Sequence, residues 1–349
     1  MVSKNNHVLI LKNDAVGDLC QSLNAINNII NNNKDKKILI YLSERSQKFN
    51  FLINSDNAVF KKLNYDLSLI EKIKLIYFLC ITKISDIYIL TPKNFYYYLP
   101  YIFRGIKFHA ICINGHRNYK RPNEYLRKFL YKYVVNDRGA TYKRDHTSEI
   151  QHKLTFNGNP IIKKKILVNP SRFLKSHLPN NYIYFHLKKD VTDKLSWDMS
   201  VLKLLFNELL KYYDYVVFTR DLEKLKHVDD IYHQFKVVDF NSEQITTNKN
   251  SNSKIILFDN IEGQDLYHTI NNSAKILAFH GMMTNLGSIN YKKIIDLWFC
   301  DIKNFNDYRN YRNAFYEFKP VYLGYNFTIP SKDILKTIRK ISYSLKNDE

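Results

Sequence analysis

Residues 7–22 read HVLILKNDAVGDLCQS, and the pattern of this stretch changes twice along its length. Residues 8–11 are apolar and include β-branched side chains, which is typical of a strand buried within a parallel sheet. Turn-forming residues follow at Asn13, Asp14 and Gly17. From Asp18 onward, apolar residues recur at helical spacing, at Leu19, Leu23, Ile26 and Ile30. The stretch therefore predicts a strand, a short loop and a helix, the unit from which α/β sheets are built.

Asp18 stands where the predicted helix begins, next to the carboxyl end of the predicted strand. Open α/β sheets bind their ligands at this edge. A carboxylate in that place has two interpretations. It is a helix N-cap, because free backbone N–H groups and the helix dipole stabilise negative charge there, or it belongs to a functional site.

The chain has 349 residues, of which 45% are hydrophobic. This length suits two domains, and the apolar content excludes a disordered chain. No signal peptide precedes the first strand and no apolar run is long enough to span a membrane, so we expect a cytoplasmic protein. The cysteines have no metal-ligand or redox-motif spacing and are predicted to be buried thiols, at Cys20, Cys80, Cys112 and Cys300.

The chain is strongly basic. Lysine and arginine number 53 against 33 aspartate and glutamate residues, which gives a net charge of +20. Such a charge attracts nucleic acid, a membrane surface or phosphorylated substrates. An AT-rich genome would also enrich lysine and asparagine without any partner, since surface lysine is neutral to the fold.

Strands and helices alternate along the whole chain. Strands are predicted at residues 38–42, 84–90, 108–113, 182–186, 215–219, 254–258, 274–279 and 293–298, with an aromatic helix at 95–103. A region rich in turn residues and lysine at 155–181 predicts the linker between two domains. The last predicted helix, at residues 331–346, has an apolar stripe and five basic residues.

Residues 116–133 combine basic and aromatic side chains, a composition that also occurs on nucleic-acid surfaces. A helix from about Pro122 would place Tyr125, Phe129 and Tyr133 on one face and the charges elsewhere. We interpret the segment as an amphipathic helix with a solvated basic side.

Two further loops follow predicted strands in the second half. The strand at 182–186 is followed by a loop that contains Lys188 and Lys189, and then by Lys194-Leu195-Ser196-Trp197. The strand ending at Phe279 is followed by HGMMTNLG at residues 280–287. Both loops are expected at the carboxyl edge of a sheet, where ligands bind.

These segments resemble glycosyltransferase family 9, which includes the bacterial heptosyltransferases of lipopolysaccharide synthesis. Residues 12–18, KNDAVGD, are similar to the family's basic residue, loop residues and Gly-Asp before an apolar helix. Residues 194–197, KLSW, are similar to its Lys-x-x-Trp segment. The resemblance implies an α/β GT-B fold, in which two Rossmann-like domains with parallel sheets face a central cleft.

The resemblance also implies roles for residues. In the family the aspartate of Gly-Asp is the proposed general base, so this role falls on Asp18, with Gly17 and Asp14 forming the loop. Lys194 is expected to reach the donor phosphate, with Lys188 and Lys189 as alternatives. A cation there makes chemical sense, because the departing nucleoside diphosphate develops negative charge.

The third segment departs from the family pattern of Asp, Ser or Thr, Gly, two residues and His. Aligning the glycine on Gly281 puts Phe279, His280 and Thr284 at the polar positions. The segment is equally similar to the donor loop of glycosyltransferase family 61. We therefore expect donor contacts from His280, Gly281, Thr284 and Asn285, and the identity of the donor stays open.

The expected protein is an inverting glycosyltransferase that needs no cofactor. It has an acceptor domain at residues 1–170, a donor domain at 181–329 and a terminal helix at 330–349 that crosses back to the first domain. The donor is a nucleotide sugar, and the acceptor is an anionic glycan or glycolipid such as a lipopolysaccharide core or capsule precursor, with peripheral contact at the anionic inner membrane.

No metal is implied, because the sequence has no Gly-x-Gly-x-x-Gly, Walker or Asp-x-Asp motif and no His/Cys/Glu cluster with ligand spacing. The alternatives are a non-catalytic basic protein that binds nucleic acid or anionic membrane, and a GT-B transferase of another family. For the transferase, no nucleic acid partner is expected.

Overall fold

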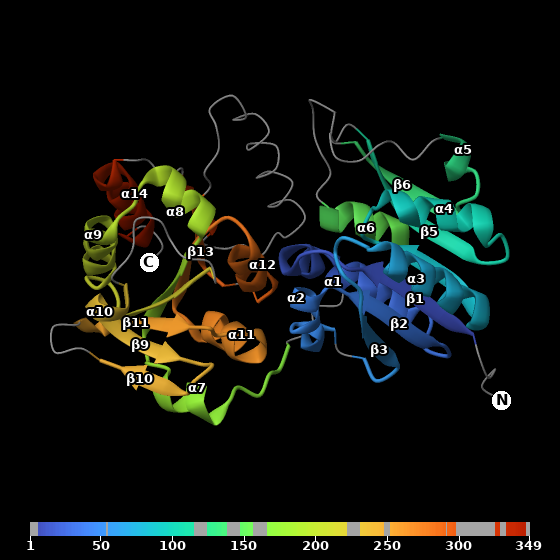
Figure 1. Ribbon diagram of the computed structural model, residues 1–349. Coiled ribbons are helices and arrows are strands. Elements are labelled where there is room, and N and C mark those ends of the chain that lie inside the picture. Colours follow the sequence, from blue (N-terminus) through green and yellow to red (C-terminus); the bar gives the residue numbers. More distant parts are fainter. Residues whose placement is uncertain are drawn as a thin grey trace. The chain divides into compact units, whose positions relative to one another are not determined.

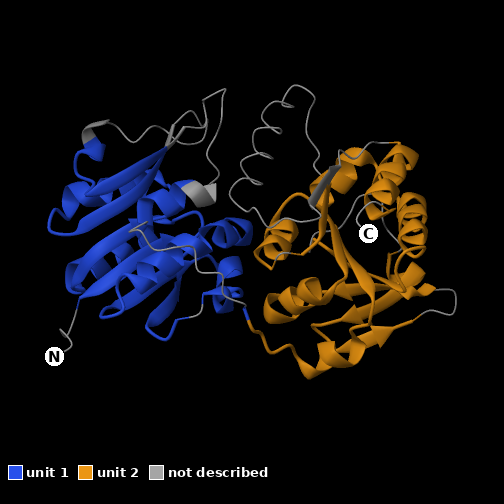
Figure 2. Cartoon of the chain, turned by 180° about the vertical axis from the view of Figure 1, so that it is seen from behind, with its two compact units in different colours: residues 1–166, 306–319 blue, residues 167–305, 320–349 orange. Residues whose placement is uncertain are grey.

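The computed structural model describes residues 6–53, 55–114, 124–137, 147–155, 166–221, 231–247, 252–290, 292–297, 325–328 and 333–346. These form two compact units (Figure 2), unit 1 up to Ile166 and unit 2 from Leu167 onward among the described residues. The predicted linker at 155–181 contains this division, and its residues 156–165 lie outside the described part.

Unit 1 is built on a sheet of six strands (Figure 1). The strands are β1 (His7–Lys12), β2 (Lys37–Leu42), β3 (Ala58–Lys62), β4 (Ile84–Ile89), β5 (Lys107–Asn114) and β6 (Lys132–Asp137). They lie in the order β3-β2-β1-β4-β5-β6, and every neighbouring pair is parallel. All residues from Val8 to Leu11 are buried, as expected for a central strand covered on both faces.

The helices of unit 1 are α1 (Val16–Asn31), α2 (Glu44–Gln47), α3 (Leu69–Ile81), α4 (Asn94–Ile102), α5 (Glu124–Arg127) and α6 (Thr147–Thr155), with a 3₁₀ turn at Asn50–Leu52. Helices α3 and α4 cover one face of the sheet (Figure 1), because their buried residues share a core cluster with Leu9 and Leu11 of β1. Helix α1 packs against α6.

Unit 2 contains a sheet of eight strands. They are β7 (Tyr182–Leu187), β8 (Tyr215–Arg220), β9 (Phe235–Asp239), β10 (Gln244–Thr246), β11 (Asn252–Asp259), β12 (Lys275–Phe279), β13 (Ile294–Leu297) and β14 (Tyr325–Thr328). The order is β10-β9-β11-β8-β7-β12-β13-β14. Only β10 runs antiparallel to its neighbour among the described strands.

The helices of unit 2 are α7 (Arg172–His177), α8 (Lys189–Leu195), α9 (Met199–Leu209), α10 (Ile231–Gln234), α11 (Gly263–Asn272), α12 (Met282–Ile289) and α14 (Ile334–Lys346). Trp197 is fully buried in the core of this unit and packs against Phe279 with ring centroids 5.4 Å apart. The tryptophan of the Lys-x-x-Trp segment is therefore a core anchor.

Several local expectations differ from the structure. The helix predicted from about Pro122 to Tyr133 ends at Arg127, and Tyr133 lies in strand β6, where aromatic and β-branched residues favour extended backbone. Residues 115–123 of the same segment lie outside the described part. The loop predicted after β7 folds as helix α8. Cys80, predicted to be buried, is exposed.

The terminal helix packs within unit 2. Helix α14 belongs to unit 2 and lies against α9, where Ile341 and Leu345 enter the core of that unit. The hydroxyl of Ser342 donates a hydrogen bond of 2.7 Å to Glu208 of α9. The apolar stripe of this helix is thus buried within unit 2.

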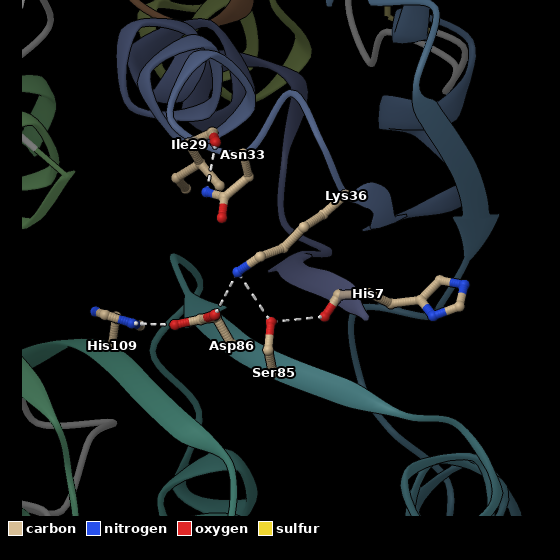
Figure 3. Close-up of polar contacts among 7 residues, drawn as sticks. All are labelled: His7, Ile29, Asn33, Lys36, Ser85, Asp86 and His109. Atoms are coloured by element: carbon tan, nitrogen blue, oxygen red, sulfur yellow. Dashed lines mark hydrogen bonds and ion pairs between the residues drawn. The ribbon is translucent and has the colours of Figure 1, made fainter. Parts of the chain in front are cut away.

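A polar cluster lies at the amino-terminal edge of the sheet in unit 1 (Figure 3). Asp86 of β4 accepts hydrogen bonds from the Lys36 ammonium at 3.2 Å and from the His109 ring at 3.1 Å. Ser85 links Lys36 to the backbone carbonyl of His7. This edge is opposite to the one where ligands bind in α/β sheets, so we interpret the cluster as structural.

The described residues include no helix long and apolar enough to cross a membrane.

Candidate functional site

The order of strands locates a candidate site in each unit. In unit 1, strand β1 is flanked by β2 on one side and β4 on the other, so the direction of winding reverses between β1 and β4. In unit 2 it reverses between β7 and β12. A crevice forms outside the carboxyl ends of the strands at such a reversal, and ligands bind there. The loops after β1 and after β7 and β12 are those that the sequence singles out.

The loop after β1 is held by buried polar contacts. Lys12 is 1% exposed, and its ammonium lies 2.6 Å from the carboxylate of Asp14. The hydroxyls of Ser43 and Ser46 each donate a hydrogen bond of 2.7 Å to the backbone carbonyl of Asp14. Asp14 is therefore held in the loop through both its side chain and its backbone carbonyl.

Asn13 extends this network to other segments of unit 1. Its side-chain amide donates to the carbonyl of Asn64 at 2.6 Å, and its oxygen accepts from the Tyr96 hydroxyl at 3.0 Å.

Lys93, which follows β4, has its ammonium 3.4 Å from the centre of the Tyr65 ring. Burial lowers the pKa of Lys93, while the charges of Asp66 and Asp14 oppose this. The β1–β4 reversal thus holds the ammonium groups of Lys12 and Lys93 and the carboxylates of Asp14 and Asp18.

Asp18 is not the N-cap of helix α1. The helix begins at Val16, its N-cap is Ala15, and Asp18 is the third helical residue. Asp18 is partly exposed, whereas Asp14 is buried. Burial raises the pKa of Asp14 and the charge of Lys12 opposes this, while the charge of Asp18 raises it further. Of these two carboxylates, Asp18 is the more exposed.

In unit 2, two loops meet at the β7–β12 reversal. The ammonium of Lys188, directly after β7, donates a hydrogen bond of 3.0 Å to the backbone carbonyl of His280, directly after β12. It also lies close to Gly281, where an added Cβ would be 3.5 Å from the Lys188 nitrogen. Lys188 and the His280–Gly281 turn therefore form one surface.

The imidazole of His280 is held by the carboxylate of Asp296. Its Nδ1 lies 2.6 Å from the carboxylate of Asp296, which is fully buried in strand β13. Ala278 pairs with Asp296 in the sheet register, and His280 comes two residues after Ala278, so both side chains lie on the same face. A carboxylate on Nδ1 fixes the ring orientation and leaves Nε2 as the other polar atom of the ring.

Thr284 and Asn285 shape this loop from within. The hydroxyl of Thr284 accepts from the backbone N–H of Gly281 at 3.1 Å, and the Asn285 amide donates to the Gly281 carbonyl at 2.8 Å. Both side chains are buried. Gly287 brings α12 close to the sheet, since an added Cβ would meet the Ile276 side chain at 2.3 Å. The N-terminus of α12 is thereby fixed beside His280.

A second hydrogen-bonded chain supports the end of β7. His186 contacts the hydroxyl of Thr219 at 2.8 Å through Nδ1 and the carboxylate of Asp221 at 3.3 Å through Nε2. Asp221 also accepts from the backbone N–H of Lys189 at 2.8 Å. Burial raises the pKa of Asp221, but the hydrogen bond and charge of His186 outweigh it and lower the pKa.

The structure brings together some of the predicted donor residues and not others. Lys188, His280, Gly281, Thr284 and Asn285 converge at one reversal. Lys194 is exposed in the last turn of α8, and no hydrogen bond or ion pair joins it to the described residues of the His280 loop.

Sequence reasoning missed Asp296, Asp221 and Lys93. Asp296 had a signal, because a carboxylate stands alone within the apolar strand segment Ile294–Leu297. Its partner could not be identified without the register of β12 and β13. The described residues hold no group of three or more His, Cys, Asp or Glu residues that could bind a metal ion.

No protein-family model matches the chain, and the search of curated proteins finds no relative. Solved structures do match. A glycosyl transferase family 9 protein from Veillonella parvula has a TM-score of 0.63 at 12% identity, with 99% of this chain and 91% of that chain covered. Escherichia coli heptosyltransferase WaaC with ADP-2-deoxy-2-fluoro heptose has a TM-score of 0.61 at 10% identity, with 98% and 100% covered.

A UDP-GlcNAc 2-epimerase from Methanocaldococcus jannaschii is also similar, with a TM-score of 0.56 at 13% identity and coverage of 97% and 92%. The α/β GT-B fold expected from the sequence is confirmed, and the structural neighbours include family 9 proteins, as the resemblance implied. At these identities the likeness establishes the fold, which transferases and epimerases share.

Proposed function

We propose that this protein is an inverting glycosyltransferase that moves a sugar from a nucleotide-sugar donor to a hydroxyl of an anionic glycan or glycolipid. The observation that carries this proposal is the convergence of Lys188, His280 and the start of α12 at the β7–β12 reversal. The family 9 resemblance of the first loop and the GT-B fold support the same reading.

The donor site is proposed to hold the diphosphate. Lys188 supplies a positive charge, and its half-buried stem keeps the ammonium beside Gly281. The N-terminus of α12 adds the partial positive charge of a helix dipole. The ring of His280, oriented by Asp296, belongs to the same loop. These groups neutralise the charge that develops on the departing nucleoside diphosphate.

On the acceptor side, we assign Asp18 as the general base. It takes the proton of the acceptor hydroxyl, the oxygen attacks the anomeric carbon, and the bond from that carbon to the diphosphate oxygen breaks on the opposite side. Attack from the face opposite to the leaving group inverts the anomeric configuration. Asp18 suits this role because it is partly exposed and not consumed as a helix cap.

The acceptor class follows from charge. A net charge of +20 favours an anionic substrate, and a lipopolysaccharide core or capsule precursor at the cytoplasmic face of the inner membrane has that chemistry. One of the similar structures suggests which donors to test. The E. coli heptosyltransferase structure contains an ADP-linked sugar analogue. ADP-linked sugars are therefore the first donors to test.

The proposal is tested by thermal shift with ADP, UDP, GDP and dTDP and their sugar conjugates. A ligand at 100 times its dissociation constant stabilises the folded protein by about 2.7 kcal/mol. Saturable stabilisation by one nucleotide family is expected. If instead generic DNA or RNA binds with a steep salt dependence and no nucleotide does, the basic-protein alternative holds. Conversion of the nucleotide sugar in the absence of any acceptor would indicate an epimerase.

A further inference from the structure

Helix α3 of unit 1 exposes an unusual number of large apolar side chains. Its exposed residues are Leu69, Ile70, Ile73, Tyr77 and Ile81, each between 56% and 71% exposed. At 3.6 residues per turn these positions fall on one side of the helix, along its whole length. Scattered apolar residues on a surface need no explanation, but a continuous apolar strip marks an interaction surface.

The opposite side of α3 already has a packing partner. Leu75 and Leu79 are buried in the core cluster that covers the sheet of unit 1. Packing in the core of unit 1 therefore accounts for the apolar residues on one side of α3, but not for those on its exposed side. A surface helix of a globular protein normally has one apolar side, which faces the core, whereas α3 has apolar residues on two sides.

Helix α4 also exposes large apolar side chains. It covers the same face of the sheet as α3 (Figure 1), and its outward residues Tyr98, Tyr101 and Ile102 are exposed. The two helices are joined at one point by Lys72 of α3, whose ammonium lies 5.8 Å from the centre of the Phe95 ring. We call the exposed apolar residues of α3 and α4 the α3–α4 face.

The charge around this face is positive. Residues 67–107 contain six basic and two acidic residues. Both acids are already engaged: Glu71 accepts from the backbone N–H of Ser68, and Asp86 pairs with Lys36 at the amino-terminal edge. Lys74 is exposed on α3, and Lys83 is exposed two residues after the helix ends.

Cations and aromatic rings are paired at the α4 end of the face. The Arg104 guanidinium lies 5.6 Å from the centre of the Tyr101 ring and 5.4 Å from that of Phe129. The Lys107 ammonium lies 5.0 Å from the centre of the Tyr131 ring. Aromatic side chains with a cation beside them suit the boundary between lipid headgroups and acyl chains.

We propose that the α3–α4 face docks on an anionic lipid bilayer, with its isoleucine and tyrosine side chains inserted at the headgroup boundary and its basic residues on lipid phosphates. The binding surface is thus assigned to unit 1 and not to the basic helix α14, which belongs to unit 2. An anionic bilayer fits the combination of apolar strip and positive rim. A second copy of the chain would bring Lys74 and Lys83 against like charges.

The face also begins beside the loop of Asp18. The carbonyl of Asn64, seven residues before Glu71, accepts a hydrogen bond from Asn13 at 2.6 Å, and its N–H donates to Glu71 of α3 at 3.2 Å. The start of α3 is therefore connected to the proposed acceptor loop through hydrogen bonds of Asn64. Presentation of a lipid-linked acceptor to Asp18 rests on the proposed function, whereas membrane binding does not.

Co-sedimentation with vesicles tests the proposal without nucleotide or acceptor. Wild-type protein is expected to bind vesicles of mixed phosphatidylglycerol and phosphatidylcholine at low salt, and to bind pure phosphatidylcholine weakly. The double variant Ile73→Asn/Tyr77→Asn should raise the half-saturating lipid concentration roughly tenfold or more, since it removes apolar contacts at the centre of the face. Its thermal midpoint should not change, because both side chains are exposed.

A matched control uses the other basic helix. Leu335 and Tyr343 of α14 are 54% and 71% exposed, and Leu335→Asn/Tyr343→Asn makes the same chemical change there. This variant is expected to bind vesicles as the wild type does. The pair Lys74→Glu/Lys83→Glu, which keeps the apolar strip, should abolish the preference for anionic vesicles.

Three results would overturn the proposal. They are absence of binding to anionic vesicles, loss of binding in the α14 variant but not in the α3 variant, and a wild-type dimer that the α3 variant converts to a monomer. The last result, measured by sedimentation velocity, would show that a second copy covers the face. Nucleotide binding is measured separately, so failure of membrane docking and failure of the proposed transferase are distinguishable.

Discussion

The ring of His280 lies 2.6 Å from the carboxylate of Asp296, and this carboxylate is fully buried in the neighbouring strand β13. A histidine oriented by a buried carboxylate is a common device wherever a protein must hold one ring nitrogen toward a ligand. Here the ring belongs to the loop that also contacts Lys188. Asp296 is therefore a positioning residue of the proposed donor site.

Replacing Asp296 with asparagine is expected to weaken binding of the nucleoside diphosphate by about tenfold, by analogy with metal sites, where loss of the orienting partner of a ligating histidine costs about 10–100-fold. Calorimetric titration measures the effect. The control is a double-mutant cycle with His280→Asn. If Asp296 acts through His280, the two losses do not add. Additive losses would mean that Asp296 supports only the fold.

Lys188 and Lys194 make a matched pair for the donor phosphate. Lys188→Ala is expected to weaken nucleoside diphosphate binding by about 1.5–3 kcal/mol, the range of a hydrogen bond to a charged group. Lys194→Ala, at an exposed position in the last turn of α8, should change it little. If Lys194→Ala weakens binding in the same titration and Lys188→Ala does not, Lys194 binds the phosphate, as the family resemblance alone favours.

Asp18→Asn is expected to lower turnover by about two to four powers of ten, which is the usual contribution of a general base. Folding and nucleotide affinity should stay as in the wild type, because Asp18 neither caps α1 nor belongs to the donor site. Transfer assays with saturating donor measure the loss. A variant that unfolds, or one that keeps full activity, would remove Asp18 from the mechanism.

Asp14→Ala should act on stability instead. It leaves the ammonium of Lys12, which is 1% exposed, without the carboxylate 2.6 Å away. Removing one partner of a buried ion pair costs about 3–5 kcal/mol. Urea unfolding checks this, and Lys12→Met/Asp14→Leu, which removes both charges, should recover part of the loss. Equal instability of the double variant would mean that Asp14 acts mainly through its other loop contacts.

The sequence allowed the architecture to be predicted because its signals are local. The change from apolar run to turn to helical spacing at residues 7–22 specifies a β–loop–α unit without reference to the rest of the chain. The same holds for the loop after β12, where the strand at Lys275–Phe279 and the helix at Met282–Ile289 bracket His280.

The contacts of the site depend on register and could not be predicted in this way. Asp296 meets His280 only because Ala278 and Asp296 are paired across two strands. Lys188 rather than Lys194 reaches the loop because residues 189–195 wind into helix α8, and this carries Lys194 away from the end of β7. The helix at 331–346 was recognised, but its partner α9 was not, since an apolar stripe does not name what it packs against.

The last prediction concerns Asp86 and the pH dependence of unit 1. Burial alone would raise the pKa of Asp86, but the contacts with His109 and Lys36 outweigh it and hold the pKa well below the usual range (Figure 3). The His109 ring is itself fixed by stacking on Tyr88, with centroids 4.3 Å apart. A depressed pKa means that the folded state favours the ionised carboxylate, so stability is present above the unfolded pKa of about 3.9 and is lost as pH falls below it.

Asp86→Asn should therefore lower the free energy of unfolding at pH 7 by about 1–3 kcal/mol, because hydrogen bonds to a charged acceptor are replaced by weaker ones. The difference between wild type and variant should shrink as the pH is lowered from 5 toward 3, where the Asp86 carboxylate of the unfolded chain takes up its proton while that of the folded protein stays ionised. Urea midpoints across this range measure it. The control is Asp35→Asn, at an exposed position beside Lys36, which should leave the midpoint unchanged at pH 7. A difference between wild type and Asp86→Asn that stays constant down to pH 3 would show that the charge of Asp86 does not stabilise the cluster.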